Sequence, residues 1–475
     1  MHVGNFRTAL YAYLVAKQTQ GAFLIRLEDT DQGRSIPGAI ESILRCLLWA
    51  GLTPDEGVVM ENGIIGQRGS KGPYIQSERQ AEGLYQTYAE KLRASGHAYP
   101  CFCTAERLEK MRHDQEQRKQ APMYDRTCLR LSSEEIERRI AAGEPHVLRM
   151  KVPHERTIEF NDAIRGVVKF QGHVVDDQVL MKSDGFPTYH LAHVVDDHLM
   201  EIDLVIRGEE WLSSLPKHLL LFEALGWTPP KYAHVPLLLN ADRTKLSKRE
   251  NAVSVEDYIA KGYLPEVLLN FLALLGWNPG TTQELFSLNE LIAQFSLDRV
   301  QKAGAIFDVT KLDWLQGQWM RKIPLSDFAA RIRPLVPQAK EDDGFEKKAA
   351  LIQERITFFS EAPTMLRFFY EQPSVSIDLL ANEKQKVKRE DLPAIFETLG
   401  TILGPISEQE WREEKLLEET KRVTGEGKWK LGQLLWPLRA VLTGLPYSPG
   451  ALEVAVALGK EETLLRLKQA ASLPS

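Results

Sequence analysis

Two short motifs, far apart in the chain, have the residue types that bind phosphate. HVGN occupies residues 2–5, directly before a helical pattern, and KLSKR occupies residues 245–249. Glycine lets backbone N–H groups approach phosphate, a helix N-terminus adds positive potential, and lysines neutralise charge that grows during displacement at phosphorus. The candidate residues are His2, Gly4, Lys245 and Lys248. The alternatives are a helix N-cap with Asn5 as the capping residue and an ordinary solvated basic run.

Three of the four cysteines form a second candidate site. Cys101, Cys103 and Cys128 lie within 28 residues of one another, and zinc prefers a tetrahedral set of such soft ligands. The alternative is three ordinary reduced thiols. Cys46 lies on an apolar helical stripe, which predicts a place in the core.

The elements that must position these residues begin with an alternation of helix and strand. Apolar residues at helical spacing predict helices from just after HVGN to residue 14 and over residues 40–48, and Ala22–Leu27 is expected to be a buried strand. The glycine-rich segment 57–72 is expected to be a loop. This order is typical of an α/β fold with parallel strand pairing.

The later elements change in character along the chain. Apolar runs predict strands at Leu204–Ile206 and Val235–Leu239 and a helix over residues 264–275 that ends at Gly276. The segment 334–348, rich in proline and charge, is expected to be a linker, and everything after it is expected to be helical.

Composition narrows the class of protein. A chain of 475 residues is too long for one core, so three or more domains are expected. A net charge of −6 gives no sign of a nucleic-acid partner for the molecule as a whole, although a local basic face is compatible with it. No apolar run reaches the ~18 residues that span a bilayer, and four cysteines in such a chain are typical of a reducing compartment. A cytoplasmic enzyme without a membrane segment is expected.

The motifs together resemble those of bacterial-type glutamyl-tRNA synthetase, a class I aminoacyl-tRNA synthetase. HVGN is similar to the HIGH motif of that class and KLSKR to its KMSKS loop. Further matching stretches are RLEDTD at 26–31, GPYIQS at 72–77, GFPTYHLA at 185–192, IRGEEW at 206–211, KLGQ at 430–433 and PLR at 437–439. The resemblance therefore covers nearly the whole chain.

The resemblance implies a fold and a division into domains. It implies an α/β Rossmann-like catalytic domain at 1–74 and 189–240, split by an acceptor-arm insert at 75–188. A stem-contact region with the KLSKR loop follows at 241–323, and an all-α anticodon-binding region at 324–475.

The resemblance also implies an activity: ATP-dependent activation of glutamate to glutamyl-adenylate, and transfer of the glutamyl group to the 3′ end of tRNA(Glu). Magnesium is expected to accompany ATP, and the enzyme is expected to be a monomer. By resemblance, ATP binds at His2, Gly4, Glu210, Leu238, Lys245 and Lys248, of which His2, Lys245 and Lys248 are catalytic. Glutamate binds at Glu28, Tyr189, His193 and Arg207.

The family also contributes expectations for zinc and for the anticodon. The thiols resemble the zinc site of its insert, with Tyr124 as the fourth ligand, because Arg130 stands where some relatives have a histidine. Arg355 falls where relatives place an arginine that contacts the anticodon. Whether tRNA(Gln) is also charged is not encoded in any motif of this chain.

The chain departs from the family pattern at its start. The family begins with a strand that carries an arginine and a Pro-Ser-Pro-Thr-Gly-like turn, whereas here Met1 directly precedes His2. A late start codon or a truncated paralogue would produce this pattern, and the chain as written is expected to be inactive or unstable.

Three rival functions remain at this point. A catalytically impaired paralogue that only binds tRNA would fit the missing strand. A shorter relative that glutamylates a tRNA base lacks an anticodon domain, and a glutaminyl-type enzyme has β-barrel anticodon domains. The strand-poor segment after residue 324 disfavours the last two.

Overall fold

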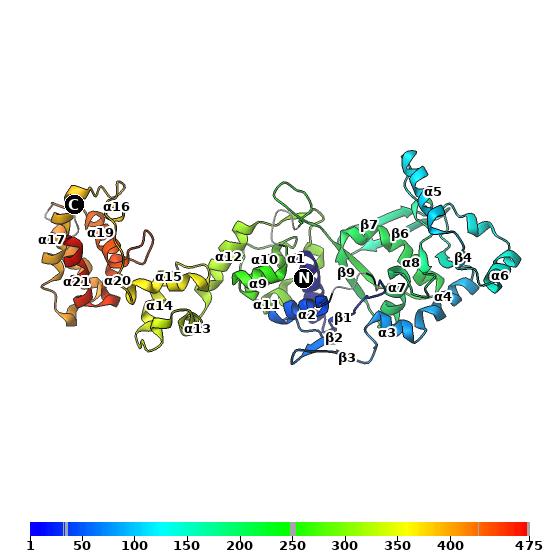
Figure 1. Cartoon of the computed structure of the whole chain (residues 1–475), viewed down its shortest axis with the longest axis horizontal. Helices are drawn as coiled ribbons and strands as arrows, with labels where there is room; N and C mark the ends of the chain where they lie inside the picture. Colours follow the sequence, from blue (N-terminus) through cyan, green and yellow to red (C-terminus); the bar gives the residue numbers. More distant parts are fainter. Residues whose placement is uncertain (32, 34–36, 248–252, 426, 473–475) are drawn as a thin grey trace. The chain divides into compact units, whose positions relative to one another are not determined.

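The structure is a computed structural model that describes residues 1–31, 33, 37–247, 253–425 and 427–472. The chain divides into two compact units, one formed by Met1–Lys261 with Pro265–Asp308 and the other by Gly262–Leu264 with Val309–Ser475. Figure 1 shows that strands and helices mix in the first unit, whereas the second is built of helices.

The first unit contains both helices and strands. Its helices are α1 (Val3–Gln18), α2 (Ala39–Trp49), α3 (Gln76–Ala81), α4 (Leu84–Ala94), α5 (Ala105–Gln117), α6 (Ser133–Ala141), α7 (Tyr189–Leu199), α8 (Leu215–Ala224), α9 (Val255–Lys261), α10 (Pro265–Leu274) and α11 (Leu288–Gln294). Its strands are β1 (Leu24–Ile25), β2 (Glu56–Glu61), β3 (Ile64–Arg68), β4 (Ala98–Cys101), β5 (Val147–Met150), β6 (Thr157–Asp162), β7 (Gly166–Gln171), β8 (Val179–Met181), β9 (Leu204–Gly208), β10 (Lys231–Val235), β11 (Leu238–Leu239) and β12 (Ala305–Ile306).

Parallel pairing, expected from the alternation of helix and strand, is confirmed in three places. β1 pairs with β2, β9 with β10, and β11 with β12, each in parallel. α8 connects β9 to β10, as parallel neighbours require, because the chain must cross over to begin the second strand at the same end. The strand predicted at Leu204–Ile206 is therefore correct.

Two predicted strands differ from those observed. The strand expected over Val235–Leu239 is wrong, because β10 ends at Val235 and the short β11 begins only at Leu238, with Pro236 between them. Proline has no N–H to donate to a ladder, which accounts for the break. The strand expected over Ala22–Leu27 is shorter, and its two paired residues are only half-buried.

The expected loop over residues 57–72 is also wrong. Most of that segment forms the antiparallel hairpin of β2 and β3. The strands are joined by Asn62-Gly63, and both residues have positive φ, at 51° and 79°. Asn-Gly suits this geometry because asparagine tolerates the left-handed region and glycine has no Cβ to clash there.

Helix α1 buries one broad face. It begins at Val3, inside the HVGN motif, and not after it as predicted. The buried side chains are Val3, Phe6, Arg7, Leu10, Tyr11, Tyr13 and Leu14. The helix packs against β9 on one side and against α10 and α11 on others. It therefore holds its N-terminus, with His2 and Gly4, at a fixed place beside β9.

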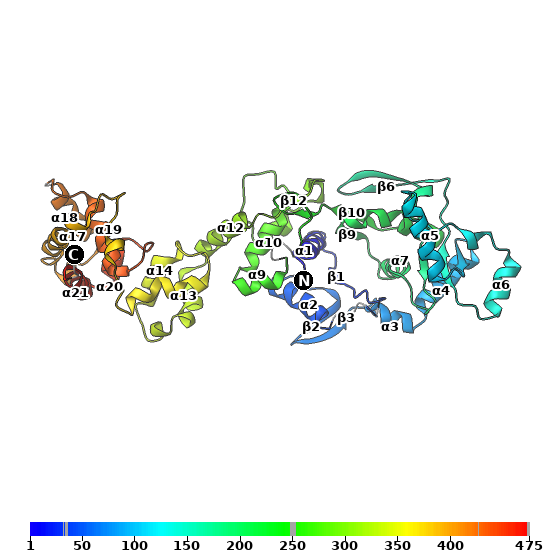
Figure 2. The same ribbon diagram turned by 45° about the horizontal axis from the view of Figure 1, so that its top comes forward.

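The segment from α4 to β8 shares its core with the helices that follow it. β4, β5 and β8 form an antiparallel sheet. Tyr85, Leu148 and Leu180 pack in one apolar cluster with side chains of α7 and α8. The hairpin of β6 and β7 extends from this region to lie beside β10 (Figure 2).

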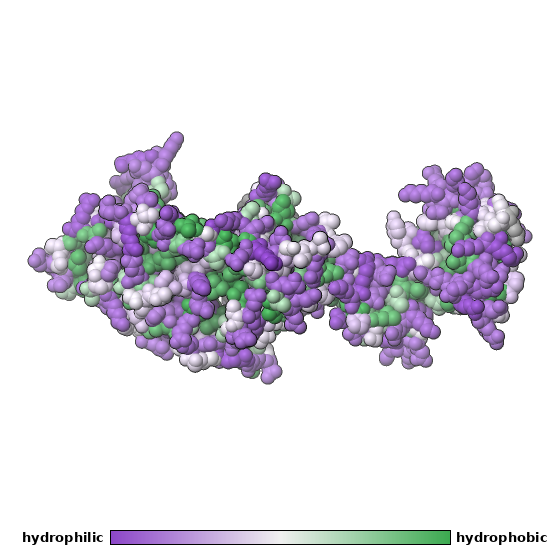
Figure 3. Space-filling view, turned by 180° about the vertical axis from the view of Figure 1, so that it is seen from behind, coloured by the Kyte–Doolittle hydropathy of each residue, from purple (hydrophilic) through white to green (hydrophobic). Residues whose placement is uncertain are grey.

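The second unit is helical, as expected. Its helices are α12 (Val309–Lys322), α13 (Leu325–Ile332), α14 (Phe345–Gln353), α15 (Ala362–Leu366), α16 (Ile377–Leu380), α17 (Leu392–Leu403), α18 (Glu413–Gly425), α19 (Leu431–Thr443), α20 (Ala451–Leu458) and α21 (Lys460–Ala471). Most of its surface seen in Figure 3 is hydrophilic, with smaller apolar patches.

The linker predicted over residues 334–348 is wrong. The segment contains short 3-10 turns and the start of α14, and Ala339 and Phe345 within it are fully buried. The proline and charged residues correctly indicated turns, but Ala339 and Phe345 between them are buried, so the segment is part of the folded unit and not a linker. Among the described residues, no helix is both long and apolar enough to cross a bilayer.

Candidate active site and metal centre

A cleft of about 450 Å³ lies in the first unit between the start of α1 and the ends of β9, β10 and β11. The residues around it come from both phosphate-binding motifs and from the strands between them. They are His2, Gly4, Asn5, Arg7, Thr8, Arg207, Gly208, Glu210, Trp211, Val235, Pro236, Leu237, Leu238, Lys245 and Leu246. The position at the carboxyl ends of parallel strands is where open α/β sheets bind ligands.

His2 is both the N-cap of α1 and part of the cleft. Its Nδ1 accepts a hydrogen bond from the backbone N–H of Gly4 at 2.9 Å. The capping residue is thus His2, and the alternative that assigned this role to Asn5 is wrong. A Cβ on Gly4 would lie 3.1 Å from Nδ1 of His2, so a larger residue there would crowd the imidazole.

The far side of the cleft is formed by β11 and the KLSKR segment. Leu238 is buried in β11, whereas Lys245 is exposed and its backbone forms a bridge with Leu239. Glu210 follows β9, and its carboxylate lies so close to Gly208 that a Cβ on that glycine would clash with it. Lys248 lies outside the described residues.

Arg207 is only 7% exposed and occupies the floor of the cleft near the end of β9. Its Nη1 donates to the hydroxyl of Tyr189 at 3.1 Å and contacts Nδ1 of His218 at 3.3 Å. Its Nε donates to Nε2 of His234 at 3.0 Å. The alternative in which Arg207 pairs with Glu209 or Glu210 is not what the structure records, because Glu209 pairs with Arg165.

The predicted glutamate-binding residues come together beside Arg207. Tyr189 and His193 are one turn apart on α7, and their ring centroids lie 5.1 Å apart. His193 contacts the carboxylate of Glu28 at 3.5 Å. Of the four predicted residues, Tyr189 joins Arg207 directly, and His193 links Tyr189 to Glu28.

Glu28 is held in its charged form by Arg26. Although partial desolvation opposes the charge, the guanidinium at 2.8 Å and His193 lower the pKa of Glu28 to about 2. Arg26 also pairs with Asp197 at 2.9 Å, and His193 contacts the same aspartate. Glu28 is therefore a carboxylate at neutral pH, which suits an ammonium group of a ligand. The neighbouring Asp29 accepts the backbone N–H of Ser77 at 2.8 Å, so it supports the start of α3.

Sequence analysis missed several residues that shape the cleft. Arg7 is buried on α1 and donates to the carbonyls of Leu275 and Pro236, which ties the helix to the cleft wall. Trp211 packs against Tyr189 with ring centroids 4.7 Å apart. The charge of Arg7 within an apolar helical stripe is a signal that could have found it, and Trp211 ends the IRGEEW motif, although no role was assigned to it from the sequence.

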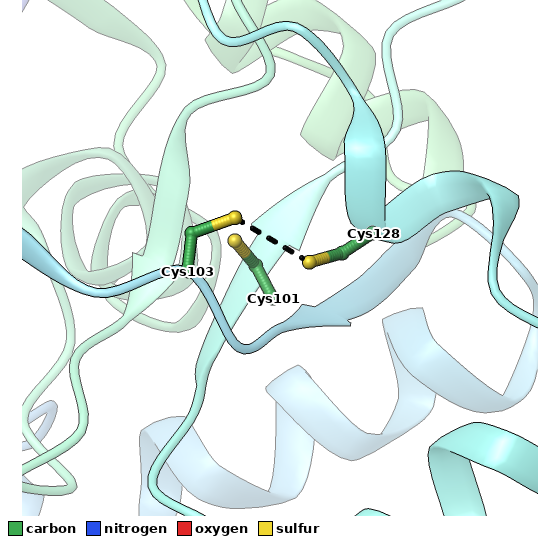
Figure 4. A group of neighbouring side chains, drawn as sticks. All are labelled: Cys101, Cys103 and Cys128. Carbon is green, nitrogen blue, oxygen red and sulfur yellow. Dashed lines mark hydrogen bonds between the residues drawn. The ribbon is translucent and has the colours of Figure 1, made fainter. Parts of the chain in front are cut away.

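Cys101, Cys103 and Cys128 meet at one point in the segment between β4 and η2 (Thr127–Arg130) (Figure 4). Their sulfur atoms all lie within 4.8 Å of one another, and Sγ of Cys103 and Sγ of Cys128 are 3.6 Å apart. The hydroxyl of Tyr124 lies 3.3 Å from the sulfurs of both Cys101 and Cys103. The three converging thiols supply three of the four ligands that a structural zinc ion requires, and the phenol oxygen of Tyr124 lies beside two of them.

One thiol of the cluster is favoured as a thiolate. Hydrogen bonding with the Cys128 thiol holds the pKa of Cys101 well below the usual thiol range, despite burial, and the same bond together with burial raises the pKa of Cys128. The guanidinium of Arg149 lies 4.1 Å from the centre of the Tyr124 ring. Zinc binds thiolates and not thiols, so Cys101 is the thiol best prepared to bind the metal. Cys46 is buried in α2, as predicted for a core residue.

Arg355 lies in the second unit, directly after α14. Its guanidinium bonds to Glu453 at 3.3 Å and to the backbone carbonyl of Leu351 at 3.0 Å. The side chain is 37% exposed, so part of it remains available to a partner.

Comparison with known proteins places both units in a class. The family described as tRNA synthetases class I (E and Q), catalytic domain, matches residues 1–314. The family described as anticodon binding domain matches residues 327–471. The fold and the cleft thus define a class I tRNA synthetase with a helical anticodon-binding domain.

Relatives that match nearly the whole chain show which family within this class it belongs to. A glutamate–tRNA ligase from Chlorobium luteolum is 44% identical over 99% of this chain and 94% of its own length. One from Clostridium tetani is also 44% identical, over 98% of this chain and 94% of its own. A crystal structure of a glutamate tRNA ligase from Elizabethkingia meningosepticum in complex with its amino acid superposes with a TM-score of 0.87 at 32% identity, covering 100% of this chain and 97% of that one. The chain belongs to the glutamate–tRNA ligase family of class I synthetases.

Proposed function

We propose that this chain is an ATP-dependent glutamate–tRNA ligase whose active site is the cleft between α1 and β9. The observation that carries the proposal is that one cleft brings the two phosphate-binding motifs together with Arg207, which itself contacts Tyr189. Phosphate chemistry and carboxylate recognition therefore share one site. A site that bound only a nucleotide would need the HVGN and KLSKR motifs but not the buried Arg207 beside them.

The first step joins glutamate to AMP. A carboxylate oxygen of glutamate attacks the α-phosphorus of ATP, and the bond to the departing pyrophosphate breaks. Gly4 presents its backbone at the positive end of α1, and Lys245 neutralises charge on the phosphates as it develops. No side chain needs to take a proton, because the attacking carboxylate is already ionised. Magnesium bound with ATP would neutralise its phosphates further.

The residues around Arg207 orient the amino acid. Arg207 binds a carboxylate of glutamate through charge-assisted hydrogen bonds, and Glu28 binds its ammonium group. Tyr189 and His193 fill the space between them and hold both charges in place. In the second step, the terminal ribose hydroxyl of tRNA attacks the activated carbonyl and AMP leaves.

A charging assay tests this proposal. The departure at the start of the chain predicts inactivity, whereas this proposal predicts activity. Purified protein with ATP, magnesium, tRNA(Glu) and radiolabelled glutamate should then form glutamyl-tRNA, and glutamine should not replace glutamate. Charging with glutamine instead would make the chain a glutaminyl-type enzyme, and label in a modified base would make it a tRNA-modifying enzyme. Binding of tRNA without adenylate formation would make it an impaired paralogue. Parallel assays with tRNA(Gln) decide whether that tRNA is also a substrate.

We propose in addition that Cys101, Cys103, Cys128 and Tyr124 bind one structural zinc ion. The supports are the convergence of the three thiols, the hydroxyl of Tyr124 beside two of them, and the negative charge favoured on Cys101. When bound, zinc would tie the end of β4 to η2 and so stabilise the segment around them. This segment, residues 75–188, is proposed to contact the acceptor arm of tRNA.

The remaining assignments extend the proposal to the other regions. Residues 241–323 are proposed to contact the tRNA stem and residues 324–475 the anticodon, with Arg355 as one contact. Lys248 is proposed to assist Lys245 at the phosphates. We also propose a monomer that works in the cytoplasm, which light scattering after size exclusion and cell fractionation would test.

A further inference from the structure

Most N–H groups of the Arg207 guanidinium face acceptors of the protein itself. A guanidinium has five N–H groups. Its Nε–H donates to His234, its two Nη1–H groups face Tyr189 and His218, and one Nη2–H faces the carbonyl of Trp211 at 3.4 Å. Among the described residues this leaves one Nη2–H for a ligand, so the direction of that bond is set by the partners of the other four.

His234 is fully buried in β10 and has a carboxylate behind it. Its Nδ1 lies 2.6 Å from Oδ2 of Asp162, which ends β6. Its Nε2 accepts from Nε of Arg207 at 3.0 Å. A guanidinium can only donate, so Nε2 must carry no proton, and the proton of the neutral ring must be on Nδ1, where it faces the carboxylate.

The orientation of Asp162 is set independently of the histidine. Its Oδ1 accepts the backbone N–H of Ile164 at 3.0 Å and that of Arg165 at 2.8 Å. The backbone N–H of His234 also points to this oxygen, at 3.3 Å. Three donors on Oδ1 leave Oδ2 facing the imidazole. Burial lowers the pKa of His234 and the charge of Arg207 adds to this, while Asp162 opposes it, so the ring is neutral at pH 7.

We propose that Asp162 and His234 are positioning residues for glutamate binding: Asp162 selects the tautomer of His234 that accepts from Arg207, and so fixes the guanidinium toward the amino acid. Neither residue touches the substrate. This inference rests on the proposed role of Arg207 as a ligand of a glutamate carboxylate. It assigns a binding role to the hairpin of β6 and β7, which contributes no residue to the lining of the cleft.

Asp162→Asn is the sharpest test because it changes one group and almost no volume. The three backbone donors keep the amide oxygen of the asparagine at the Oδ1 position, so its NH₂ group faces His234. Nδ1 must then accept, the proton moves to Nε2, and Nε2–H faces Nε–H of Arg207. Two donors cannot share a hydrogen bond, so the guanidinium must shift.

The tautomer can be read directly from the full-length protein. In ¹⁵N spectra of histidine-labelled protein, a protonated ring nitrogen and a bare one have widely separated chemical shifts. The His234 signals are identified by their loss in His234→Gln. The wild type is expected to show a proton on Nδ1, and Asp162→Asn a proton on Nε2. A proton on Nε2, or on both nitrogens, in the wild type would overturn the proposal.

Binding is measured by calorimetry, so that the result does not depend on turnover. Asp162→Asn is expected to weaken glutamate binding by about tenfold or more, while ATP binding changes by less than about twofold. Lys169→Gln is the matched control, because Lys169 lies on the same hairpin but is exposed and pairs only with Glu159 among the described residues. Equal weakening of glutamate and ATP binding would indicate a general structural defect and would overturn the proposal.

A second pair of variants covers the case in which Asp162→Asn does not fold. His234→Gln keeps an oxygen that can accept from Arg207, whereas His234→Phe has no acceptor. Glutamate binding is expected to be weaker in the phenylalanine variant than in the glutamine variant, and equal binding in the two would overturn the proposal.

Arg207→Ala separates this inference from the proposed function. If Arg207→Ala leaves glutamate binding unchanged, the assignment of Arg207 to glutamate fails, and with it the positioning role. If Arg207→Ala abolishes binding while Asp162→Asn moves the proton and leaves binding intact, the proposed function stands and the positioning role fails.

Discussion

The two ends of the cleft differ in how tightly their charged groups are held. Arg207 is almost wholly buried and four of its N–H groups face protein acceptors. Lys245, at the other end, is exposed, and among the described residues its backbone alone is held, by Leu239 and Asn240. The difference matches the two tasks. Distinguishing one amino acid from another requires a fixed direction, whereas neutralising phosphate charge requires only a cation within reach.

The contrast also shows in what surrounds each charge. Arg207 faces neutral imidazoles and a phenol, so its charge is not cancelled by a nearby carboxylate and remains available to an anionic ligand. Glu28, by contrast, is paired with Arg26, and its pKa of about 2 keeps it charged. A buried cation left uncancelled is costly unless a ligand or polar groups compensate it, which indicates a binding role.

The largest effect is expected at the buried end. Arg207→Ala leaves His234 and Tyr189 without their donor and removes the carboxylate ligand, a loss of roughly 4 kcal/mol or about a thousandfold in kcat/KM for glutamate. The KM for ATP should change little. Steady-state charging at varied glutamate and ATP measures both. Arg156→Ala, which removes an exposed arginine paired with Glu223, is the control and should behave as wild type. An equal loss in Arg207→Ala and Arg156→Ala would show that the effect is not specific to Arg207, and the buried end of the cleft would then have no special role.

A smaller effect is expected at the exposed end. Lys245→Ala and Lys248→Ala should each slow adenylate formation by about a hundredfold, roughly 3 kcal/mol of charge stabilisation, with little change in glutamate affinity. ATP–pyrophosphate exchange in the presence of tRNA measures the rate. An unchanged exchange rate would remove the KLSKR segment from the mechanism, and a large loss of glutamate affinity would mean that both ends act on the amino acid.

The cysteine cluster lies outside the cleft, so a change there should affect metal content and leave the two ends of the cleft as they are. Metal analysis is expected to find about one zinc per chain, and Cys101→Ser should abolish it while leaving ATP binding intact, because three ligands remain too few for a closed structural site. Cys46→Ala is the matched control and should retain the metal, since Cys46 is a core residue of α2. Metal-free wild-type protein with full charging activity would refute the zinc proposal.

The smallest effect is expected from the histidines around Arg207. Burial lowers the pKa of His218 well below its usual range, with His193, Arg207, His190 and Lys217 acting in the same direction. The unfolded chain then binds the extra proton first, so the free energy of unfolding should fall as pH drops below about 6.5, by at most about 1.4 kcal/mol per pH unit from this residue. Urea unfolding of wild type and His218→Gln between pH 7 and pH 5 measures the slope. An identical slope in the two proteins would contradict the expectation.

Sequence predictions were mostly correct where an element is set by local interactions, and mostly wrong where it depends on packing. Helices α2 and α10 were predicted because apolar spacing and a terminal glycine are local signals. The hairpin of β2 and β3 was missed although its Asn62-Gly63 turn is also local, because the surrounding glycines were interpreted as a loop. The linker expected over residues 334–348 was wrong because its proline and charge content outweighed two apolar residues, Ala339 and Phe345, that are fully buried.

The amino-acid sequence alone indicated the family, the parallel strand pairing and the helical second unit, and it predicted most side chains now proposed for the site. His2, Tyr189 and Arg207 stand in motifs that resemble those of the family, so their chemistry could be inferred from neighbours in sequence. Only the tertiary structure decided how Arg207 is held. Asp162 and His234 belong to separate strands and carry no motif of their own, and they meet because the hairpin of β6 and β7 packs beside β10. A hydrogen bond needs its atoms placed to within a few tenths of an ångström, and that placement comes from packing between elements, which no local pattern encodes.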